Sequence, residues 1–422
     1  GGEARIAMQG GAIDLPGVFA EPVIALDELR ATLAWRIEPV PGAPAALQVQ
    51  LRDVQFANVD AQGELRATWS SGRGGPAPGR DARLPGRLEL DGTLARGRAP
   101  SVARYLPLAL PEGTRRYVEQ AVQGGDIRKA AFRVQGDLAD FPRFTAGAPG
   151  ELRIAIEVED LTLAYMPGAD TPWPPLTQAR GEIVFDRGAF EFRNAHGRLF
   201  GVELGALQGG MRNVYDAPLL TLDTVARGPL ADMLRFVNTT PAGAGLHGAL
   251  REVATSGDGE LKLALKLPLR DLARTGVTGS LVLPGNDLRL RADLPPVAGA
   301  SGRIAFSERG LGRVDARGRL LGGDATLEGC TQADGALHLA LQGRASAEAL
   351  RQAPELGPLA RAATALSGQA GYRLALTVAP SGWLDLELTS DLAGLAVDLP
   401  PPLAKRADAT LALRLRGERL PT

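Results

Sequence analysis

The stretch GELKLALKLPL, Gly259 to Leu269, places leucine at every second position. Successive side chains of a β-strand point to opposite faces, so this stretch predicts a strand with one leucine face and one face that carries Lys262 and Lys266. Something must cover the leucine face, because fully burying one leucine is worth about 2 kcal/mol. A protein core, a second sheet or a ligand that is not protein could do so.

One-sided strands of the same kind recur along the chain, in ELRIAIEVED from Glu151, YRLALTV from Tyr372 and GWLDLELT from Gly382. Strands buried on both faces would be apolar throughout, so this pattern predicts an antiparallel sheet with one face exposed to solvent, which we call the wet face. We expect the following residues to line the apolar face: Leu152, Ile154, Ile156, Val158, Ile183, Phe185, Leu261, Leu263, Leu265, Leu267, Ile304, Phe306, Leu337, Leu339, Leu374, Leu376, Leu386 and Leu388.

The chain also contains a longer repeat. PPLTQARGEIVFDRGAFEFRNAHGRLFG, from Pro174, aligns without a gap to PPVAGASGRIAFSERGLGRVDARGRLLG, from Pro295. A fainter third copy begins at Pro401 and needs a slip of one residue. Stacked repeats share one continuous core, and their shared face usually carries the function of the protein.

Short helical patterns punctuate the strands. They cover Pro100–Val122 in two pieces, Pro229–Val237 and Ser346–Leu366, and Pro229 and Ser346 are suitable first residues of a helix. Each helix precedes a fresh set of strands. We therefore expect a partial β-groove module at 1–97, helix-plus-β-groove modules at 98–225 and 226–342, and a partial one at 343–422.

The expected fold is mainly β. About 25 strands spaced ~4.8 Å apart would make an unbroken sheet ~120 Å long, which must twist and curl. Three helical segments are too few to cover its apolar face. We therefore expect an elongated, highly twisted antiparallel sheet curled into a groove, with a few short helices between modules. A sealed β-sandwich core is the alternative that the pattern leaves open.

Composition narrows the function classes. The 422 residues are 45% hydrophobic and 23% charged with a formal net charge of −1, which is too apolar for disorder and does not favour a nucleic-acid partner. The single cysteine, Cys330, excludes an intrachain disulfide framework. No long uncharged apolar run and no signal-peptide pattern occurs, and the opening residues read like the middle of a longer protein.

Motifs of catalysis are nearly absent. His196, His247 and His338 stand apart, and none has a second metal ligand at suitable spacing. The one G-x-G-x-x-G, Gly243–Gly248, follows a helix and a proline instead of a strand, so a connector is the better interpretation. We expect no enzyme activity, no cofactor and no metal, and we expect Trp173 to pack within a loop.

A family resemblance adds to these expectations. The segment YLPLALPEGTRRYVEQAVQGGDIRKAAFRVQGDLADFP, Tyr105–Pro142, resembles a signature segment of the YhdP branch of the AsmA-like proteins, in which a short helix and a G-x-I turn lead into a strand and a G-x-L-x-D-F-P element. The resemblance extends over essentially the whole chain. The matching residues here are Gly125, Ile127, Gly136, Leu138, Asp140, Phe141 and Pro142.

The resemblance implies a periplasmic segment of a protein anchored in the inner membrane of Gram-negative bacteria. It implies a bridge-like curled sheet whose apolar groove carries phospholipid between the inner and outer membranes, and contact with both membranes through parts outside this segment. Two rivals remain open. One is a non-enzymatic envelope scaffold for outer-membrane biogenesis with a protein-filled core. The other is an enzyme on a β-solenoid, which would need a cluster of carboxylates or basic groups on one face, and the sequence shows none.

Overall fold

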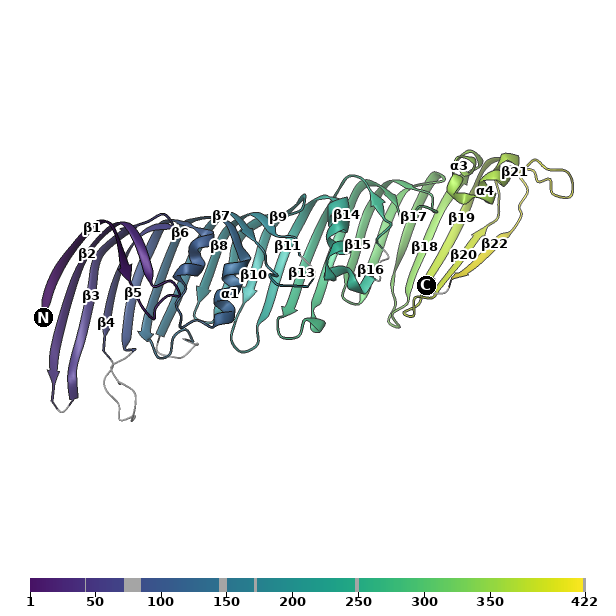
Figure 1. Cartoon of the computed structure of the whole chain (residues 1–422). Coiled ribbons are helices and arrows are strands. Elements are labelled where there is room, and N and C mark those ends of the chain that lie inside the picture. The colour runs from purple at the N-terminus through teal and green to yellow at the C-terminus, as the bar shows by residue number, and fades with distance from the viewer. Residues whose placement is uncertain (42, 72–84, 144–149, 171–172, 247–249, 420–422) are drawn as a thin grey trace. The chain divides into compact units, whose positions relative to one another are not determined.

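The computed structural model describes residues 1–41, 43–71, 85–143, 150–170, 173–246 and 250–419 (Figure 1). Its 22 strands belong to one hydrogen-bonded sheet, and the strand pairs are antiparallel. The chain divides into two compact units. Unit 1 comprises Gly1–Leu199, Leu204–Asp223 and Leu267–Arg274, and unit 2 comprises Phe200–Glu203, Thr224–Lys266 and Thr275–Thr422.

Strands β1 to β9 lie in unit 1, β10 and β11 are shared, and β12 to β22 lie in unit 2 except for the end of β13. The strands are β1 Gly2–Asp14, β2 Val23–Val40, β3 Ala43–Ala57, β4 Ala61–Ser70, β5 Arg87–Arg98, β6 Val122–Asp137, β7 Gly150–Leu163, β8 Leu176–Asp186, β9 Ala189–Leu199, β10 Val202–Met211, β11 Leu219–Pro229, β12 Ala254–Thr255, β13 Asp258–Pro268, β14 Gly276–Arg289, β15 Val297–Ser307, β16 Gly310–Leu320, β17 Gly322–Thr331, β18 Leu337–Ser346, β19 Leu366–Val378, β20 Leu384–Ser390, β21 Leu395–Val397 and β22 Leu413–Arg419.

Helices are short and few, as expected. They are η1 Ala99–Tyr105, α1 Glu112–Ala121, α2 Leu230–Thr239, η2 Pro241–Leu246, η3 Leu272–Arg274, α3 Ala347–Arg351, η4 Pro354–Leu356, α4 Pro358–Ala362 and η5 Ala363–Ala365. The predicted starts are confirmed: Pro229 is the N-cap of α2, and the Ser346 side chain accepts a hydrogen bond from the Ala349 N–H as the N-cap of α3. Among the described residues, none of these helices has the length and apolarity needed to cross a membrane.

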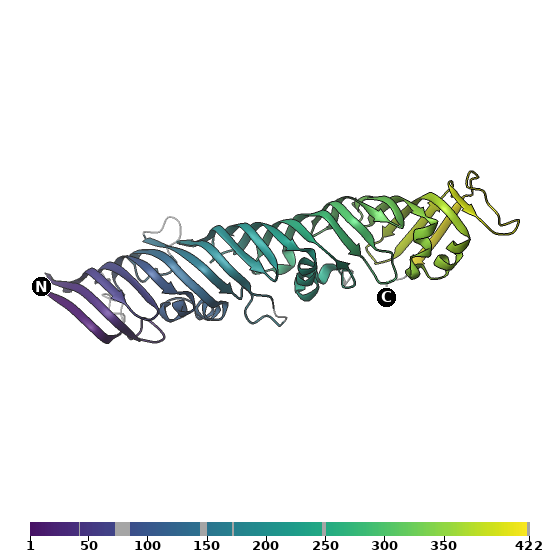
Figure 2. The ribbon, with the colours of Figure 1, turned by 90° about the horizontal axis from the view of Figure 1, so that it is seen from above.

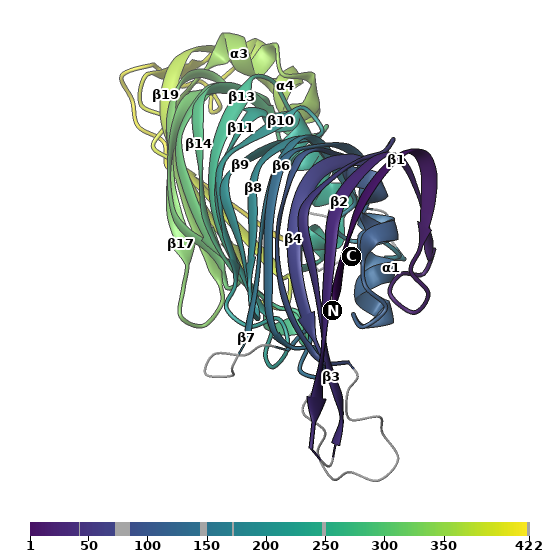
Figure 3. The same cartoon turned by 90° about the vertical axis from the view of Figure 1, so that its left-hand side faces the viewer.

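The mainly β antiparallel architecture is therefore confirmed, but the expected strong curl is wrong. The strands of unit 1 bend over the helical segment (Figure 3), yet the sheet is not strongly curled. Register shifts, which mark β-bulges and local bends, interrupt ladders such as β6–β7 and β7–β8, whereas Gly2–Gln9 pairs with Glu28–Trp35 without one. The four-module division and the groove stay predictions.

All helical segments except η3 enter the sheet at the same end of its strands. Connections in an antiparallel sheet alternate between the two ends, and η1, α2 and α3 follow β5, β11 and β18, which run in the same direction. We call this end of the strands the helix rim and the opposite end the hairpin rim. In each unit the helices lie on one side of the sheet (Figure 2).

The sequence repeat is also a structural repeat. Strands β8 and β9 correspond residue for residue to β15 and β16 in the ungapped alignment. The turn that follows has a left-handed residue in both copies, Phe200 at φ 52° and Leu321 at φ 53°. A glycine comes next in each, and a helix of the same unit packs against it: Asp232 of α2 beside Gly201, and Ser346 beside Gly322. An added Cβ would contact these groups in both copies, and Gly322 also has a left-handed φ of 80°, which favours glycine at the last position of its G-R-L-x-G.

Candidate functional site

The apolar side chains of unit 1 line up in rows across the sheet. Residues directly opposite each other in an antiparallel pair point to the same face, so successive pairings define a row. One row runs from Gly92 through Phe132, Ile154 and Phe185 to Phe190, across β5 to β9. The structure thus brings together residues from five strands that the sequence separates by about a hundred positions.

The other predicted residues of unit 1 join the same face. Ile156 lies opposite Ile183, and both pack against a buried cluster that contains Val158 and Ala99 of η1. Leu152 lies opposite Val134 and is buried. We call this surface the apolar face of unit 1. Leu267, at the end of β13, also belongs to unit 1 and is half-buried.

Unit 2 has an equivalent apolar face, made mainly of leucine. Leu261 lies opposite Leu281, which in turn lies opposite Ile304. Further along the sheet, Leu339 lies opposite Leu376, which lies opposite Leu386, and the row from Leu341 through Leu374 to Leu388 runs beside it. The predicted residues of this face are all half-buried: Leu261, Leu263, Leu265, Ile304, Phe306, Leu337, Leu339, Leu374, Leu376, Leu386 and Leu388.

Exposure varies across the apolar face of unit 1. Near the helix rim the side chains are covered, as at Ile127 and Leu161, which are 7% and 6% exposed. Near the hairpin rim they open to solvent: Trp35 is 39% exposed and Ile37 56%, although Leu152 stays buried. The face is therefore closed at the helix rim and open at the hairpin rim.

No second sheet covers these side chains within the part of the chain that the structure describes, because every described strand belongs to the one sheet. A β-sandwich core is normally sealed by a facing sheet about 10 Å away. The helical segments other than η3 enter at the helix rim, and Ala99 of η1 packs on the sheet there. What remains is an extended aliphatic surface in partial contact with water.

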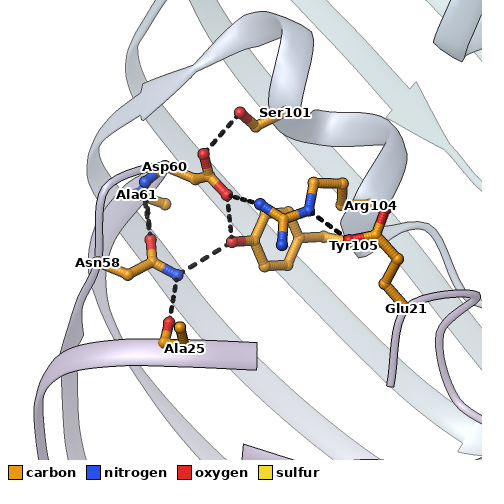
Figure 4. Close-up of polar contacts among 8 residues, drawn as sticks. All are labelled: Glu21, Ala25, Asn58, Asp60, Ala61, Ser101, Arg104 and Tyr105. Carbon is orange, nitrogen blue, oxygen red and sulfur yellow. Dashed lines mark hydrogen bonds and ion pairs between the residues drawn. The ribbon is translucent and has the colours of Figure 1, made fainter. Parts of the chain in front are cut away.

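A buried polar network fixes the helical segment of unit 1 over the sheet (Figure 4). Asp60, in the turn between β3 and β4, is 4% exposed. Its carboxylate accepts hydrogen bonds from the Ser101 hydroxyl at 2.8 Å and the Tyr105 hydroxyl at 2.9 Å, and it pairs with Arg104 at 2.6 Å. The Asn58 amide donates to the Tyr105 oxygen at 3.0 Å. These bonds attach η1 to the β3–β4 turn.

The network sets the charge state of its carboxylate. Burial alone would raise the pKa of Asp60, but the hydrogen bonds from Ser101 and Tyr105 and the charges of Arg104 and Arg98 together lower it below its ordinary value. Burial raises the pKa of Tyr105, whose hydroxyl therefore stays protonated as the donor to Asp60.

We expect Asp60→Asn to lower the free energy of unfolding by about 2 kcal/mol at pH 7, because a buried charged acceptor loses its partners. The folded pKa lies below the unfolded value of about 3.9, so this stabilisation is present above about pH 4 and is lost as the pH falls through the folded pKa. Urea unfolding at pH 7 and at pH 2.5 checks both parts. Asp315→Asn, on the wet face, is the control and should change stability by less than about 0.5 kcal/mol. An equal loss for Asp60→Asn at both pH values would contradict the role of its charge.

A basic cavity of about 460 Å³ lies at the β8–β9 hairpin, on the hairpin rim of unit 1. Two of its four arginines are paired, Arg153 with Asp186 at 3.0 Å and Arg193 with a glutamate at 2.7 Å. Within the described residues, Arg187 and Arg212 have no carboxylate in salt-bridge range. Its lining residues are Arg153, Val184, Asp186, Arg187, Gly188, Ala189, Phe190, Glu191, Arg193, Arg212 and Asn213.

This cavity lies mainly on the wet face, because the strand residues that line it alternate with those of the apolar face, and it meets the apolar face at one residue. Phe190 lines it, and on the apolar face the Phe190 ring lies 4.9 Å from that of Phe185 and 4.6 Å from that of Phe192. The cavity therefore reaches the apolar face only at the hairpin, through Phe190. Neither Arg187 nor Arg212 was predicted as a site residue, because their proximity depends on hairpin packing that one-dimensional periodicity does not encode.

The residues that were candidates for catalysis or cofactor binding lie in ordinary strand, helix and loop positions where the structure describes them. His196 is half-buried on β9 and His338 is exposed on β18, whereas His247 lies outside the described residues. Gly243 lies in η2, while Gly248 is not among the described residues. Trp173 packs edge-on against Tyr165, as expected of a loop residue. Among the described residues, no group of three metal-ligating side chains comes together.

Sequence missed several residues of the apolar face, because only strand pairing shows that they belong to it. Trp35 and Trp69 both lie opposite Val49, so both belong to one row at the hairpin rim. Phe132, Val134 and Phe190 extend the rows of the predicted residues. Aligning the apolar alternation of each predicted strand with that of its neighbours in the sequence would have found them.

Comparison with known proteins gives two matches. The sequence model of a family described as "YhdP protein" matches residues 1–419. A curated relative, "Intermembrane phospholipid transporter YhdP" of Escherichia coli (strain K12), is 24% identical over 305 residues. That alignment covers 71% of this chain but 23% of the relative, so the chain spans about a quarter of that protein's length. No solved structure matches.

Proposed function

Because the chain belongs to the YhdP family, we propose that its apolar faces bind the acyl chains of phospholipids and carry them along the sheet. On this proposal the chain is a periplasmic segment of a lipid transfer bridge that is anchored in the inner membrane and carries phospholipid between the inner and outer membranes. The relative named as an intermembrane phospholipid transporter supports the choice of cargo.

One observation carries the proposal: a single sheet presents rows of aliphatic side chains that the described helices leave half-buried. Apolar surface removed from water contributes about 25 cal/mol per Å², so such rows favour an apolar partner. Soluble proteins seldom expose large contiguous apolar patches unless these patches bind something. An acyl chain is flexible and has no polar groups to satisfy, so it suits a surface made of leucine, isoleucine and valine.

The mechanism follows from the uniformity of the surface. In a row of similar side chains, an acyl chain meets nearly the same energy at each strand, so it can slide without a deep minimum. Headgroups would stay at the hairpin rim of unit 1, where Trp35 and Ile37 open to solvent. No side chain has to react, so the segment would catalyse no reaction. Direction would come from a lipid gradient or from partners.

The first test is to purify the chain in detergent-free buffer, record native mass spectra and extract bound lipid. We expect several phospholipids per chain. A folded chain that is free of lipid would contradict the proposal. It would favour the alternative of an envelope scaffold for outer-membrane biogenesis whose apolar face is filled by protein.

The basic cavity allows a separate prediction about the headgroups of the bound lipids. Arg187→Asn with Arg212→Gln removes the charges of both arginines that lack a carboxylate partner among the described residues, and asparagine tolerates the left-handed backbone of residue 187, at φ 55°. If phosphate groups at the hairpin rim contact these arginines, the ratio of anionic to zwitterionic lipid bound should fall about 2- to 5-fold, since exposed ionic contacts are worth at most about 1 kcal/mol. Lipid mass spectrometry measures the ratio. Arg309→Gln, at an exposed hairpin of unit 2, is the matched control, and an unchanged ratio in the double variant would exclude the contact.

A further inference from the structure

On the apolar faces, four aromatic residues lie directly opposite a glycine and fill the place of its missing side chain. In unit 1 the pairs are Gly2 with Trp35 and Gly92 with Phe132. In unit 2 they are Gly279 with Phe306 and Gly343 with Tyr372. In each of these four pairs the ring is on the strand that follows the strand of the glycine. Phe56 on β3 also lies opposite a glycine, Gly63 on β4, but its ring is not among the atoms nearest to the place of that side chain. Aromatic residues make up only 5% of the chain, so four such pairs in the same arrangement call for an explanation.

The glycines provide space for the rings. A Cβ atom built on any of the four would lie within 3.0 Å of the opposite ring or its hydroxyl oxygen, closer than real Cβ atoms come. The tip of each ring therefore occupies the place of the missing side chain. Each ring lies across the neighbouring strand instead of standing up from the sheet.

Backbone conformation does not account for these glycines. None of the four has a left-handed φ, so an ordinary side chain would fit the backbone at each position. At Gly92 the atoms nearest to an added Cβ are two ring atoms of Phe132 and the Cβ of Leu65. What excludes a side chain at Gly92 is thus mainly the ring, and an added methyl group would force the ring to move.

We propose that these glycine–aromatic pairs set the height of the apolar faces, by holding bulky rings flat so that acyl chains pass over them. This inference rests on the proposed function. It identifies the residues that determine how much space the acyl chains have above the sheet. An upright ring would rise above the neighbouring leucine side chains and stand in the path of a chain that moves along the row. A flat ring adds apolar contact area without forming an obstacle.

A purely structural role is the competing explanation, because aromatic residues opposite glycine also stabilise sheets by covering the exposed backbone. The two explanations differ for variants that keep the fold but change the position of the ring. Gly92→Ala should lift the Phe132 ring. Gly92→Ala with Phe132→Ala removes the ring again, and Phe132→Ala alone leaves a low surface. A structural role predicts that all three lose stability and that none changes lipid uptake per folded chain.

The experiment measures the rate at which the full 422-residue chain takes up fluorescent phosphatidylethanolamine from vesicles, normalised to the folded fraction from circular dichroism. We expect Gly92→Ala to slow uptake about 5-fold relative to the unchanged chain. The same substitution in the Phe132→Ala background should change uptake by less than about 2-fold, because the ring that it would lift is absent. Gly343→Ala, with and without Tyr372→Ala, repeats the test in unit 2.

The outcomes separate the inference from the proposed function. Slow uptake in the glycine variants that the ring deletions reverse supports the inference. If the unchanged chain takes up lipid and the glycine variants do so equally fast, the inference is wrong and the proposed function stands. If Gly92→Ala slows uptake as much in the Phe132→Ala background as in the unchanged chain, the rings do not set the clearance. If the unchanged chain binds no phospholipid, the proposed function fails and the inference fails with it.

Discussion

Replacing Leu263 and Leu265 together by aspartate is expected to abolish phospholipid binding by unit 2. Both leucines are half-buried on the apolar face, and Leu265 lies opposite Val277. Each leucine contributes about 2 kcal/mol of apolar contact when fully covered, so the pair accounts for about 4 kcal/mol, or roughly a 1,000-fold loss of affinity. Carboxylates add a desolvation cost, because an acyl chain offers them no hydrogen bond. Native mass spectrometry should show fewer lipids per chain.

The matched control places the same two carboxylates on the other face of the same strand. Lys262 and Lys266 are exposed on β13, so Lys262→Asp with Lys266→Asp changes charge without touching the apolar face. We expect this variant to bind lipid like the unchanged chain. Circular dichroism should show the same sheet content in both variants. Lipid retained by the leucine variant at the level of the lysine variant would mean that this face does not bind the chains.

Local sequence rules predicted much of the fold. Alternation over two residues placed the strands, and Pro229 and Ser346 start helices as expected, because capping and proline geometry depend only on neighbouring residues. The internal repeat predicted that β8 and β9 would recur as β15 and β16, which they do with matching bounds. Because apolar and polar residues alternate along each strand, every predicted residue of β13 to β20 in unit 2 lies on one face.

What sequence could not predict depends on contacts between distant residues. The attachment of η1 to the sheet needs Asn58 and Asp60 to meet Ser101, Arg104 and Tyr105, and no local pattern indicates that meeting. Curvature was overestimated because it depends on where bulges fall, and bulges are single-residue events that leave the apolar period almost unchanged. The pairing of glycine with aromatic residues likewise depends on register, which only the folded sheet defines.

Tryptophan fluorescence offers the most direct view of what covers the apolar face of unit 1. Trp35 is 39% exposed and, like Trp69, lies opposite Val49 on that face. Bromine atoms on an acyl chain quench indole on contact, so phospholipids with brominated chains should remove most of the emission of Trp35 and Trp69. Trp173, which packs against Tyr165 in a loop, should keep most of its emission. Variants that retain one tryptophan, with phenylalanine at the other positions, separate the signals.

The position of the bromine adds a test of orientation. Trp35 lies near the hairpin rim, where the face is open, whereas the side chains near the helix rim are covered. If headgroups stay at the hairpin rim, bromine close to the headgroup should quench Trp35 more strongly than bromine at the chain end. The reverse order would place the headgroups at the helix rim. Equal protection of Trp35, Trp69 and Trp173 from all brominated lipids would mean that protein covers the face, and the scaffold function would then explain the fold better than lipid transfer.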